Sequence, residues 1–302
     1  MLEHMNGIDD MAIHFSAQGL LLLNIVLAFI MLGISLELRK EDFTNLLRNK
    51  KTTIVGLTAH FLLLPALTFA LVKLLHPPPS VALGMILVGS CPGGNMSNLF
   101  THFAKGNTAL AVGLTSVSHF LAIVLTPLNF SFYGGLDAST ATLFKEIQLP
   151  LGDVFQTVIL VVVIPLTTGL TINHYKPDAA RRAQKIMKPF SLIAFGVFLV
   201  VAFAGNAKAF ANNLGLILPL VIIHNALALS SGYLFSRVAR LDFRDCKTIT
   251  FETGVQNNGL GLILIFTFFN GMGGMALVAA CWGIWHLVTG GLLAFIWSKK
   301  IG

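Results

Sequence analysis

Long apolar segments separated by short polar connectors make up most of the chain. Runs of 17 or more mainly apolar residues recur from Leu20–Leu36 to the C-terminal end, and this length is typical of bilayer-spanning helices. The pattern predicts nine spans, at about residues 20–36, 52–75, 80–104, 107–132, 151–173, 190–208, 214–237, 246–269 and 274–297. We therefore expect an all-α integral membrane protein with a single domain over residues 1–302.

The composition supports this class and excludes several others. Of the 302 residues, 55% are hydrophobic and 11% are charged, and the mean hydropathy is +0.79. An ordinary soluble domain does not have such values. The connectors are too short to build a folded basic surface, so we expect the lipid bilayer as a partner and no binding of nucleic acid.

Basic residues predict the orientation. Assigning alternate connectors to one side places 17 of the 20 Lys and Arg residues there, including the predicted basic loop from Lys176 to Lys188. The other side receives Lys73, Lys145 and Lys208. The positive-inside rule then predicts a multi-pass protein of the cell (inner) membrane with the N-terminus outside and the C-terminus in the cytoplasm.

Two spans contain residues that break helices. The third span is interrupted by S-C-P-G-G-N-M-S-N, with Pro92, Gly93 and Gly94, and the eighth by F-E-T-G-V-Q-N-N-G, with Gly254. Because these spans are five helices apart, they cross the membrane in opposite directions. This arrangement predicts an inverted-topology repeat with two crossing discontinuous helices. The halves would be residues 17–132 and 187–298, with an extra helix at 150–174.

Glu252 is an acidic residue deep in an apolar segment, and an unpaired carboxylate there would cost roughly 3 kcal/mol. Oxygen ligands suit a small hard cation such as sodium. Two ligand clusters are predicted: Ser97, Asn98, Thr115 and Glu252 in the first, and Glu252, Gln256 and the carbonyls of Thr253 and Val255 in the second. The N-terminus of the half-helix that starts near Asn95 would attract an anion.

The motifs C-P-G-G-N-M-S-N, Lys105-Gly106-Asn107 and E-T-G-V-Q-N resemble the bile acid:sodium symporter family in sequence and spacing along nearly the whole chain. The resemblance implies panel and core helix groups, and two sodium ions that drive uptake of bile acids or smaller organic anions such as pantoate. It assigns the same two sodium clusters. It also places Asn95, Asn257 and His286 near the substrate.

Two positions depart from the family pattern. His60 stands where the family usually has a glutamine ligand of the second sodium site, and Ala111 replaces a serine of the first site. Neutral imidazole is a poor sodium ligand, and alanine offers no side-chain oxygen. Two alternatives follow: a symporter that keeps sodium coupling, or a proton-coupled or sodium-independent transporter of the same fold, in which His60 replaces the ligand.

Other functional classes have less support in the sequence. An intramembrane enzyme using Glu252 and His60 would need a reactive partner or a resident metal, and no motif supplies one. We therefore expect no enzymatic activity, no cofactor and no metal beyond sodium as a coupling ion. A receptor or channel of the same fold stays an alternative. No motif distinguishes a sterol-sized anion from a small carboxylate, or indicates an oligomeric state.

Overall fold

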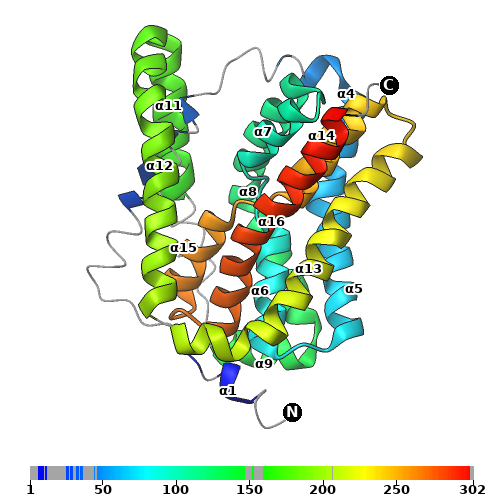
Figure 1. The fold of residues 1–302 in the computed structure, drawn as a ribbon, viewed down its shortest axis with the longest axis vertical. Helices are drawn as coiled ribbons and strands as arrows, with labels where there is room; N and C mark the ends of the chain where they lie inside the picture. Colours follow the sequence, from blue (N-terminus) through cyan, green and yellow to red (C-terminus); the bar gives the residue numbers. More distant parts are fainter. Residues whose placement is uncertain are drawn as a thin grey trace.

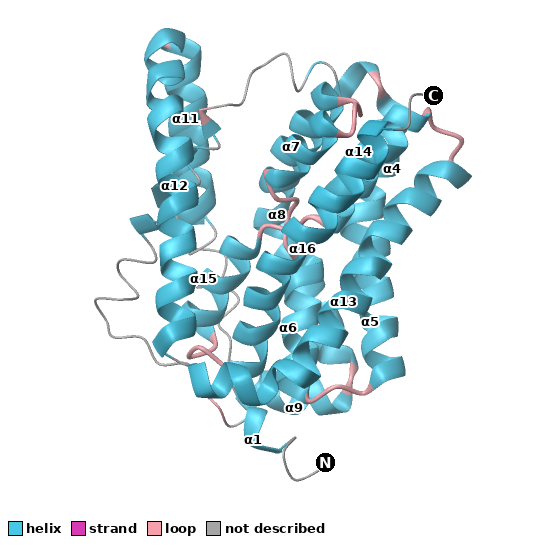
Figure 2. Cartoon of the chain, viewed as in Figure 1, coloured by secondary structure: helices cyan, strands magenta, loops and turns pink. Residues whose placement is uncertain are grey.

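The computed structural model describes residues 6–9, 11, 25–26, 28–29, 32–33, 35–36, 44, 46–146, 152, 159–205 and 207–299. These residues are mostly helical, with short loops between the helices and no strand among them (Figure 2). The first half of the chain contains α1 (Asn6–Asp9), α4 (Lys50–Thr58), η1 (Ala59–Leu63), α5 (Leu64–Leu75), α6 (Pro79–Ser90), α7 (Met96–Phe103), α8 (Thr108–Leu136) and α9 (Ala138–Glu146). The second half contains η2 (Ile159–Val163), α11 (Ile164–Tyr175), α12 (Pro177–Gly205), α13 (Ala207–Val238), α14 (Phe243–Gly254), α15 (Asn258–Phe268) and α16 (Gly273–Lys299).

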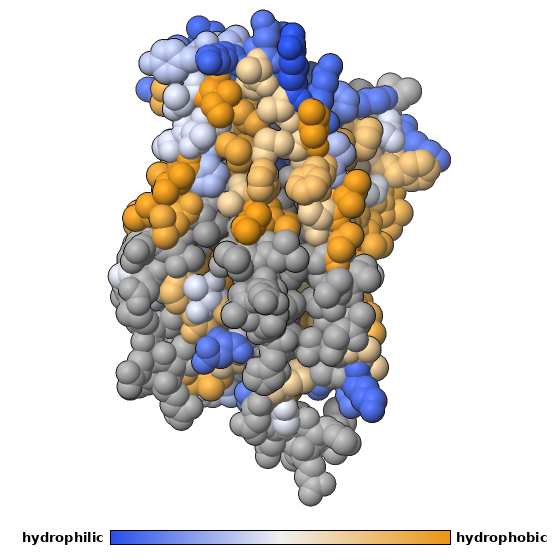
Figure 3. Space-filling view, turned by 90° about the vertical axis from the view of Figure 1, so that its left-hand side faces the viewer, coloured by the Kyte–Doolittle hydropathy of each residue, from blue (hydrophilic) through white to orange (hydrophobic). Residues whose placement is uncertain are grey.

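Four helical segments of the described part are long and apolar enough to cross a bilayer: Lys50–Leu75, Thr108–Leu136, Phe210–Val238 and Gly273–Lys299. Two shorter apolar helices, α6 and α15, belong to the two spans predicted to be broken. A wide band of apolar side chains lies below a hydrophilic end on the face shown in Figure 3. The described part of the chain is therefore helical, as in a multi-pass membrane protein. The count of nine spans stays a prediction, because most of the first span and part of the fifth lie outside the described residues.

The predicted loop from Lys176 to Lys188 is wrong. Only Lys176 lies between α11 and α12, and residues 177–188 form the first three turns of α12. Pro177 occupies the first helical position, where a missing N–H costs nothing, and the following Ala, Arg, Gln and Lys residues favour a helix. The charges therefore extend a helix beyond the apolar segment instead of interrupting it. Residues 138–146, between the fourth and fifth predicted spans, also form a helix, α9.

The second span contains a π-helical turn, η1, which ends two residues before Pro65. Proline has no N–H to donate to the carbonyl four residues earlier, which belongs to Phe61. Asn129 of α8 donates its Nδ2–H to this Phe61 oxygen at 2.8 Å. The irregular turn is thus supported by a neighbouring helix, and it carries His60 into the interior of the bundle, where 1% of the residue is exposed.

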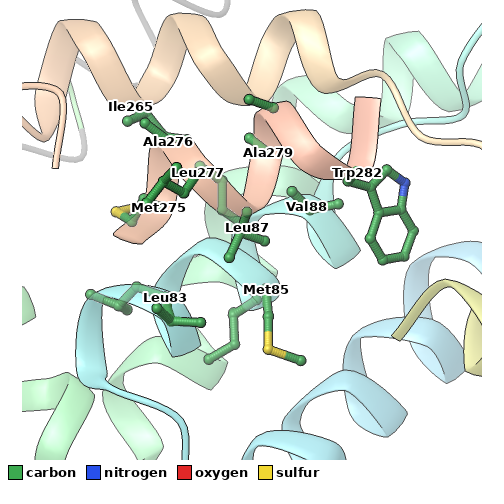
Figure 4. Packing of buried hydrophobic residues seen from close by; sticks show 14 of the residues in the cluster. Leu83, Met85, Leu87, Val88, Ile265, Met275, Ala276, Leu277, Ala279 and Trp282 are labelled. Atoms are coloured by element: carbon green, nitrogen blue, oxygen red, sulfur yellow. The ribbon is translucent and has the colours of Figure 1, made fainter. Parts of the chain in front are cut away.

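The core lies where α6 packs against α16 (Figure 4). Leu83, Leu87 and Val88 of α6 face Met275 and other apolar residues of α16. A Cβ at Gly84 would lie 2.8 Å from Met275 Cα, so the absence of a side chain allows the close approach of these helices. The break that follows α6 therefore begins directly after a closely packed pair of helices.

α1 and the C-terminal end of α16 lie at opposite ends of the bundle (Figure 1). At the end that includes α1, the Lys73 ammonium donates to Asp137 Oδ2, and this ion pair joins α5 to the turn before α9. The opposite end contains the start of α14, the end of α7 and the junction of α11 with α12 (Figure 1). Most of the basic residues described belong to this second end.

Candidate functional site

The gap between α6 and α7 faces the gap between α14 and α15, near the middle of the bundle (Figure 2). The Gly94 N–H donates to Val255 O at 2.7 Å, and the Asn257 N–H donates to Pro92 O at 2.8 Å. These bonds form an isolated antiparallel bridge between two unwound segments. They pair backbone groups that the helix breaks would otherwise leave unsatisfied in a bilayer.

Glycines at the first break allow this contact. A Cβ at Gly93 would overlap Glu252 Oε1, and a Cβ at Gly94 would lie 2.7 Å from Gln256 O. Both glycines therefore bring the backbone of one broken span against the polar residues of the other. The predicted break residues Pro92, Gly93, Gly94 and Gly254 thus lie at or directly beside the meeting point of the two spans.

Hydroxyl groups from two other helices surround the Glu252 carboxylate, which is buried with 1% of the residue exposed. Ser97 Oγ of α7 and Thr115 Oγ1 of α8 each donate to Glu252 Oε2 at 2.8 Å. Ser118 Oγ of α8 lies 3.4 Å from Glu252 Oε1. Glu252 therefore joins three helices through one buried polar cluster.

The four residues predicted to form the first cation cluster lie together. Asn98 Oδ1 is 3.2 Å from Thr115 Oγ1, and the Ser97 and Thr115 hydroxyl oxygens are 3.3 Å apart. Ala111 is fully buried one helical turn before Thr115 and contributes no oxygen. The cluster offers carboxylate, hydroxyl and amide oxygens, which are the ligand types that suit sodium.

Glu252 has no basic partner within ion-pair distance among the residues that the structure describes. The ion pairs found there are Lys73–Asp137 and Arg181–Asp178, both far from the cluster in sequence. Hydrogen bonds from neutral hydroxyls do not cancel the charge of a buried carboxylate, and burying such a charge is costly. A bound cation would supply the missing positive charge.

The second predicted cluster is different, because its carbonyls already accept hydrogen bonds. Thr253 O accepts from Gln256 Nε2 at 2.8 Å, and Val255 O accepts from Gly94 N at 2.7 Å. Two buried side-chain oxygens of this segment, Thr253 Oγ1 and Gln256 Oε1, have no hydrogen-bond partner within the described part. These two side-chain oxygens therefore remain free to bind a cation, in addition to the two carbonyls.

His60 lies between the two broken spans. Its Nε2 is 2.9 Å from Cys91 O at the end of α6, and its Nδ1 is 3.1 Å from Glu252 O of α14. Both neighbours are acceptors, whereas a neutral imidazole donates from only one nitrogen. The ring thus bridges the backbones of α6 and α14 and offers no oxygen to an ion.

Asn257 begins α15 and connects it to α8. Its Oδ1 accepts from the Leu260 N–H at 3.2 Å and caps the helix, while its Nδ2 lies 3.1 Å from His119 Nε2. Asn95 is the half-buried residue at the start of α7. The N-terminal ends of α7 and α15 therefore both point toward the crossing, and helix N-termini attract anions.

His286 on α16, predicted to lie near the substrate, is buried beside the second break. Its Nδ1 is 3.0 Å from Nδ2 of Asn258, and the same Asn258 amide donates to Gln256 O at 3.2 Å. This contact links α16 to the unwound segment. His286 thus reaches the crossing through Asn258.

Sequence reasoning missed several residues of this site. Ser118 and His119 follow Thr115 by three and four positions, so helical spacing puts all three on one face of α8. Asn225 donates to Gly254 O, the last carbonyl of α14, at 2.8 Å and accepts from Thr289 Oγ1 at 2.7 Å. A polar residue within the apolar run of α13 was the available signal.

Comparisons with known proteins identify the family of the chain. The model of the Sodium Bile acid symporter family matches residues 24–213. The chain is 34% identical to an uncharacterized sodium-dependent transporter of Bacillus subtilis, YocS, over 92% of this chain and 84% of that protein. It is 32% identical to the probable chloroplastic sodium/metabolite cotransporter BASS1 of Arabidopsis thaliana, over 91% of this chain and 66% of that protein. It is 28% identical to the human ileal sodium/bile acid cotransporter, over 79% of this chain and 67% of that protein.

Proposed function

Because the chain belongs to the sodium bile acid symporter family, we propose that it is a secondary transporter that carries an organic anion across the membrane together with sodium. The observation that carries the proposal is the Glu252 carboxylate, which is buried among the hydroxyls of Ser97 and Thr115 without a basic partner in the described part. Sodium at this cluster would neutralise the carboxylate. The anion would then meet a crossing that no longer carries a net negative charge.

The first cation position uses Ser97, Asn98, Thr115 and Glu252. Their oxygens come from α7, α8 and α14, so a bound ion would hold these three helices in one arrangement. An ion that binds one arrangement more tightly than another shifts the population toward it. Sodium binding would thereby prepare the crossing for the substrate.

The anion would bind at the N-terminal ends of α7 and α15, beside Asn95 and Asn257. Both helix ends present backbone N–H groups and a positive dipole end. Bile-acid-like molecules and small carboxylates share the anionic group that this position recognises. His286 would contribute through its contact with Asn258.

Transport would follow alternating access, in which a core containing the two broken spans rocks against a panel of other helices. α11 and α12 stand beside the rest of the bundle as a long hairpin and are the candidates for the panel (Figure 1). The N-terminus would face outward and the C-terminus the cytoplasm, in keeping with the location of α1 and the end of α16 on opposite sides of the bundle.

His60 favours a second version of the mechanism, with sodium at the first position and none at the second. The ring occupies the space between Cys91 O and Glu252 O, where a glutamine side chain would offer an oxygen. A ring that carries two protons would donate to both carbonyls. The alternative to sodium coupling is therefore a proton-coupled or sodium-independent transporter of the same fold.

Purified protein in proteoliposomes tests the proposal. We expect counterflow of a labelled anion, chosen from a thermal-shift screen that includes a bile acid and pantoate, and stronger binding when potassium is replaced by sodium. Glu252→Ala should lose sodium-driven uptake, whereas Thr142→Ala, at an exposed helix position, should keep it. Undiminished sodium-driven uptake by Glu252→Ala would reject the cation position, and binding that ignores sodium but changes with pH would support the proton-coupled alternative.

A further inference from the structure

Asn107, in the turn between α7 and α8, has more polar contacts than a helix cap requires. Its Oδ1 accepts from the Leu110 N–H at 3.1 Å, which is the usual capping bond of α8. Its other groups reach α14: the backbone N–H donates to Thr248 Oγ1 at 2.9 Å, and Nδ2 donates to Asp245 Oδ1 at 2.8 Å. One residue therefore fixes the start of α8 and holds it against the start of α14.

Neighbouring groups reinforce this contact. Thr248 Oγ1 lies 3.2 Å from the Asn107 carbonyl, and Thr52 Oγ1 of α4 lies 3.4 Å from Asp245 Oδ2. A Cβ at Gly106 would lie 2.8 Å from Thr101 Cγ2 and 3.2 Å from Thr248 Oγ1, so the turn approaches α14 closely. We call Thr52, Asn107, Asp245 and Thr248 the junction.

Lys247 adds a further link between the same elements. Only 4% of the residue is exposed, and its ammonium donates to Ala104 O, at the C-terminal end of α7, at 2.8 Å. A cation at the C-terminal end of a helix is favourable because the last carbonyls carry partial negative charge. α7, α8 and α14, the three helices whose side chains surround Glu252, are thus tied together at one end of the molecule.

The junction lies close to the cation cluster along both helices. Thr115 follows Asn107 by eight positions on α8, and Glu252 follows Thr248 by four positions on α14. These separations correspond to about two turns and one turn, or about 12 Å and 6 Å of helix. A shift of α8 along α14 at the junction would therefore move the Thr115 hydroxyl relative to the carboxylate to which it donates at 2.8 Å.

Polar contacts define one register in a way that apolar packing does not. An amide and a carboxylate bond only at the correct offset, and polar residues between packed helices can fix helix register. Asn107 and Asp245 are half-buried, and Thr248 is fully buried. We infer that Asn107 is a positioning residue for the cation cluster: through Asp245 and Thr248 it sets the register of α8 against α14, and so determines how tightly sodium binds at Glu252. This inference rests on the proposed function.

Exchange of the two polar side chains gives a specific test. In Asn107→Asp the capping oxygen remains, but a second carboxylate faces Asp245, and the donated hydrogen bond is lost. We expect the sodium concentration for half-maximal thermal stabilisation, titrated against potassium at constant ionic strength, to rise about tenfold. Adding Asp245→Asn returns a donor to the pair, so the double variant should recover most of the wild-type affinity. Asp245→Asn alone should stay close to the wild type, because its amide oxygen still accepts from Asn107.

The readout separates positioning from a purely structural role. A structural residue would lower the unfolding temperature in potassium and leave the half-saturating sodium concentration unchanged, and that result for Asn107→Asp would overturn the inference. Failure of the double variant to recover affinity would also overturn it. Asn107→Ser, which keeps a cap but cannot reach Asp245, replaces Asn107→Asp if that variant does not fold, and should show a smaller rise. A wild-type protein that does not respond to sodium would overturn the proposed function and this inference together, whereas a sodium-responsive wild type with an equally responsive Asn107→Asp would overturn the inference alone.

Discussion

Thr115 Oγ1 donates to Glu252 Oε2 at 2.8 Å, although the two residues are 137 positions apart in the chain. The contact joins α8 to the half-helix α14, and Ser97 Oγ of α7 donates to the same carboxylate oxygen. An ion that replaces part of this hydrogen bonding would be held by groups from all three helices. This relationship makes the cluster around Glu252 sensitive to the relative position of those helices.

The Thr115 hydroxyl itself is the first target for mutation. Thr115→Val keeps the shape of the side chain but removes a hydrogen bond and an ion ligand, a loss worth about 1.5 kcal/mol or roughly tenfold in affinity. We expect the half-saturating sodium concentration in a thermal-shift titration to rise by that factor, and Glu252→Gln to abolish the response. Thr142→Val makes the same chemical change at an exposed position and should behave as the wild type. Equal sodium affinity in Thr115→Val and the wild type would remove Thr115 from the ion site.

Gly93 tests whether the close approach of the two breaks is required. A Cβ at this position would overlap the Glu252 carboxylate, so Gly93→Ala must displace either the unwound segment or the acid. We expect a loss of about 1–3 kcal/mol in the free energy of unfolding and loss of sodium-dependent uptake. Gly135→Ala is the matched control, because a Cβ there meets no atom within 4 Å. Wild-type uptake by Gly93→Ala would show that the two segments separate without consequence.

Local sequence features identified the main elements of the site. Glycine and proline within apolar segments predict helix breaks, and an acid in such a segment needs a partner, so Glu252 and the segment around Pro92 were accessible without coordinates. The contact between the two helix breaks could not be predicted from local sequence features. It depends on backbone hydrogen bonds, such as the one from Gly94 to Val255, that leave no mark on side-chain chemistry.

Other features were hidden by competing signals. The charges of residues 177–188 suggested a connector, but their helix propensity extends α12 beyond the apolar segment. Asn107 reads locally as a helix cap, which it is, and its bonds to Asp245 and Thr248 follow only from the packing of α8 against α14. Long-range polar pairs of this kind are set by tertiary structure and not by local spacing.

The ion pair between Lys73 and Asp137 predicts an acid-dependent change at the end of the bundle that includes α1. Hydrogen bonds from the Lys73 ammonium and from Ser139 hold the pKa of Asp137 below its usual range. A carboxylate with a lowered folded-state pKa stabilises the protein above its unfolded-state pKa of about 3.9, and this stabilisation is lost as the pH falls toward the folded-state value. Thermal unfolding should be measured from about pH 6 to about pH 3, a range that includes the unfolded-state pKa of about 3.9. The unfolding temperature should fall more steeply with decreasing pH in the wild type than in Asp137→Asn. Parallel curves for the two proteins would contradict this account.

His60 lies beside the proposed second cation position without offering an oxygen, and we expect its replacement by glutamine to complete that position. The imidazole bridges Cys91 O and Glu252 O and supplies no oxygen. Thr253 Oγ1 and Gln256 Oε1, which are close to Glu252 in sequence, are buried and have no hydrogen-bond partner in the described part. In His60→Gln the side-chain carbonyl would add a sodium ligand, and its amide would still donate to one of the two main-chain carbonyls. A second ion would then bind together with the first.

The expected result for His60→Gln is a steeper dependence of anion uptake on sodium. Two ions that bind cooperatively raise the Hill coefficient of sodium-driven uptake above the wild-type value, and sodium should also increase the unfolding temperature of the variant more than that of the wild type. His102→Gln makes the same substitution at an exposed position of α7 and controls for loss of a histidine. An unchanged Hill coefficient in His60→Gln, with uptake intact, would mean that the imidazole is not what prevents a second ion from binding.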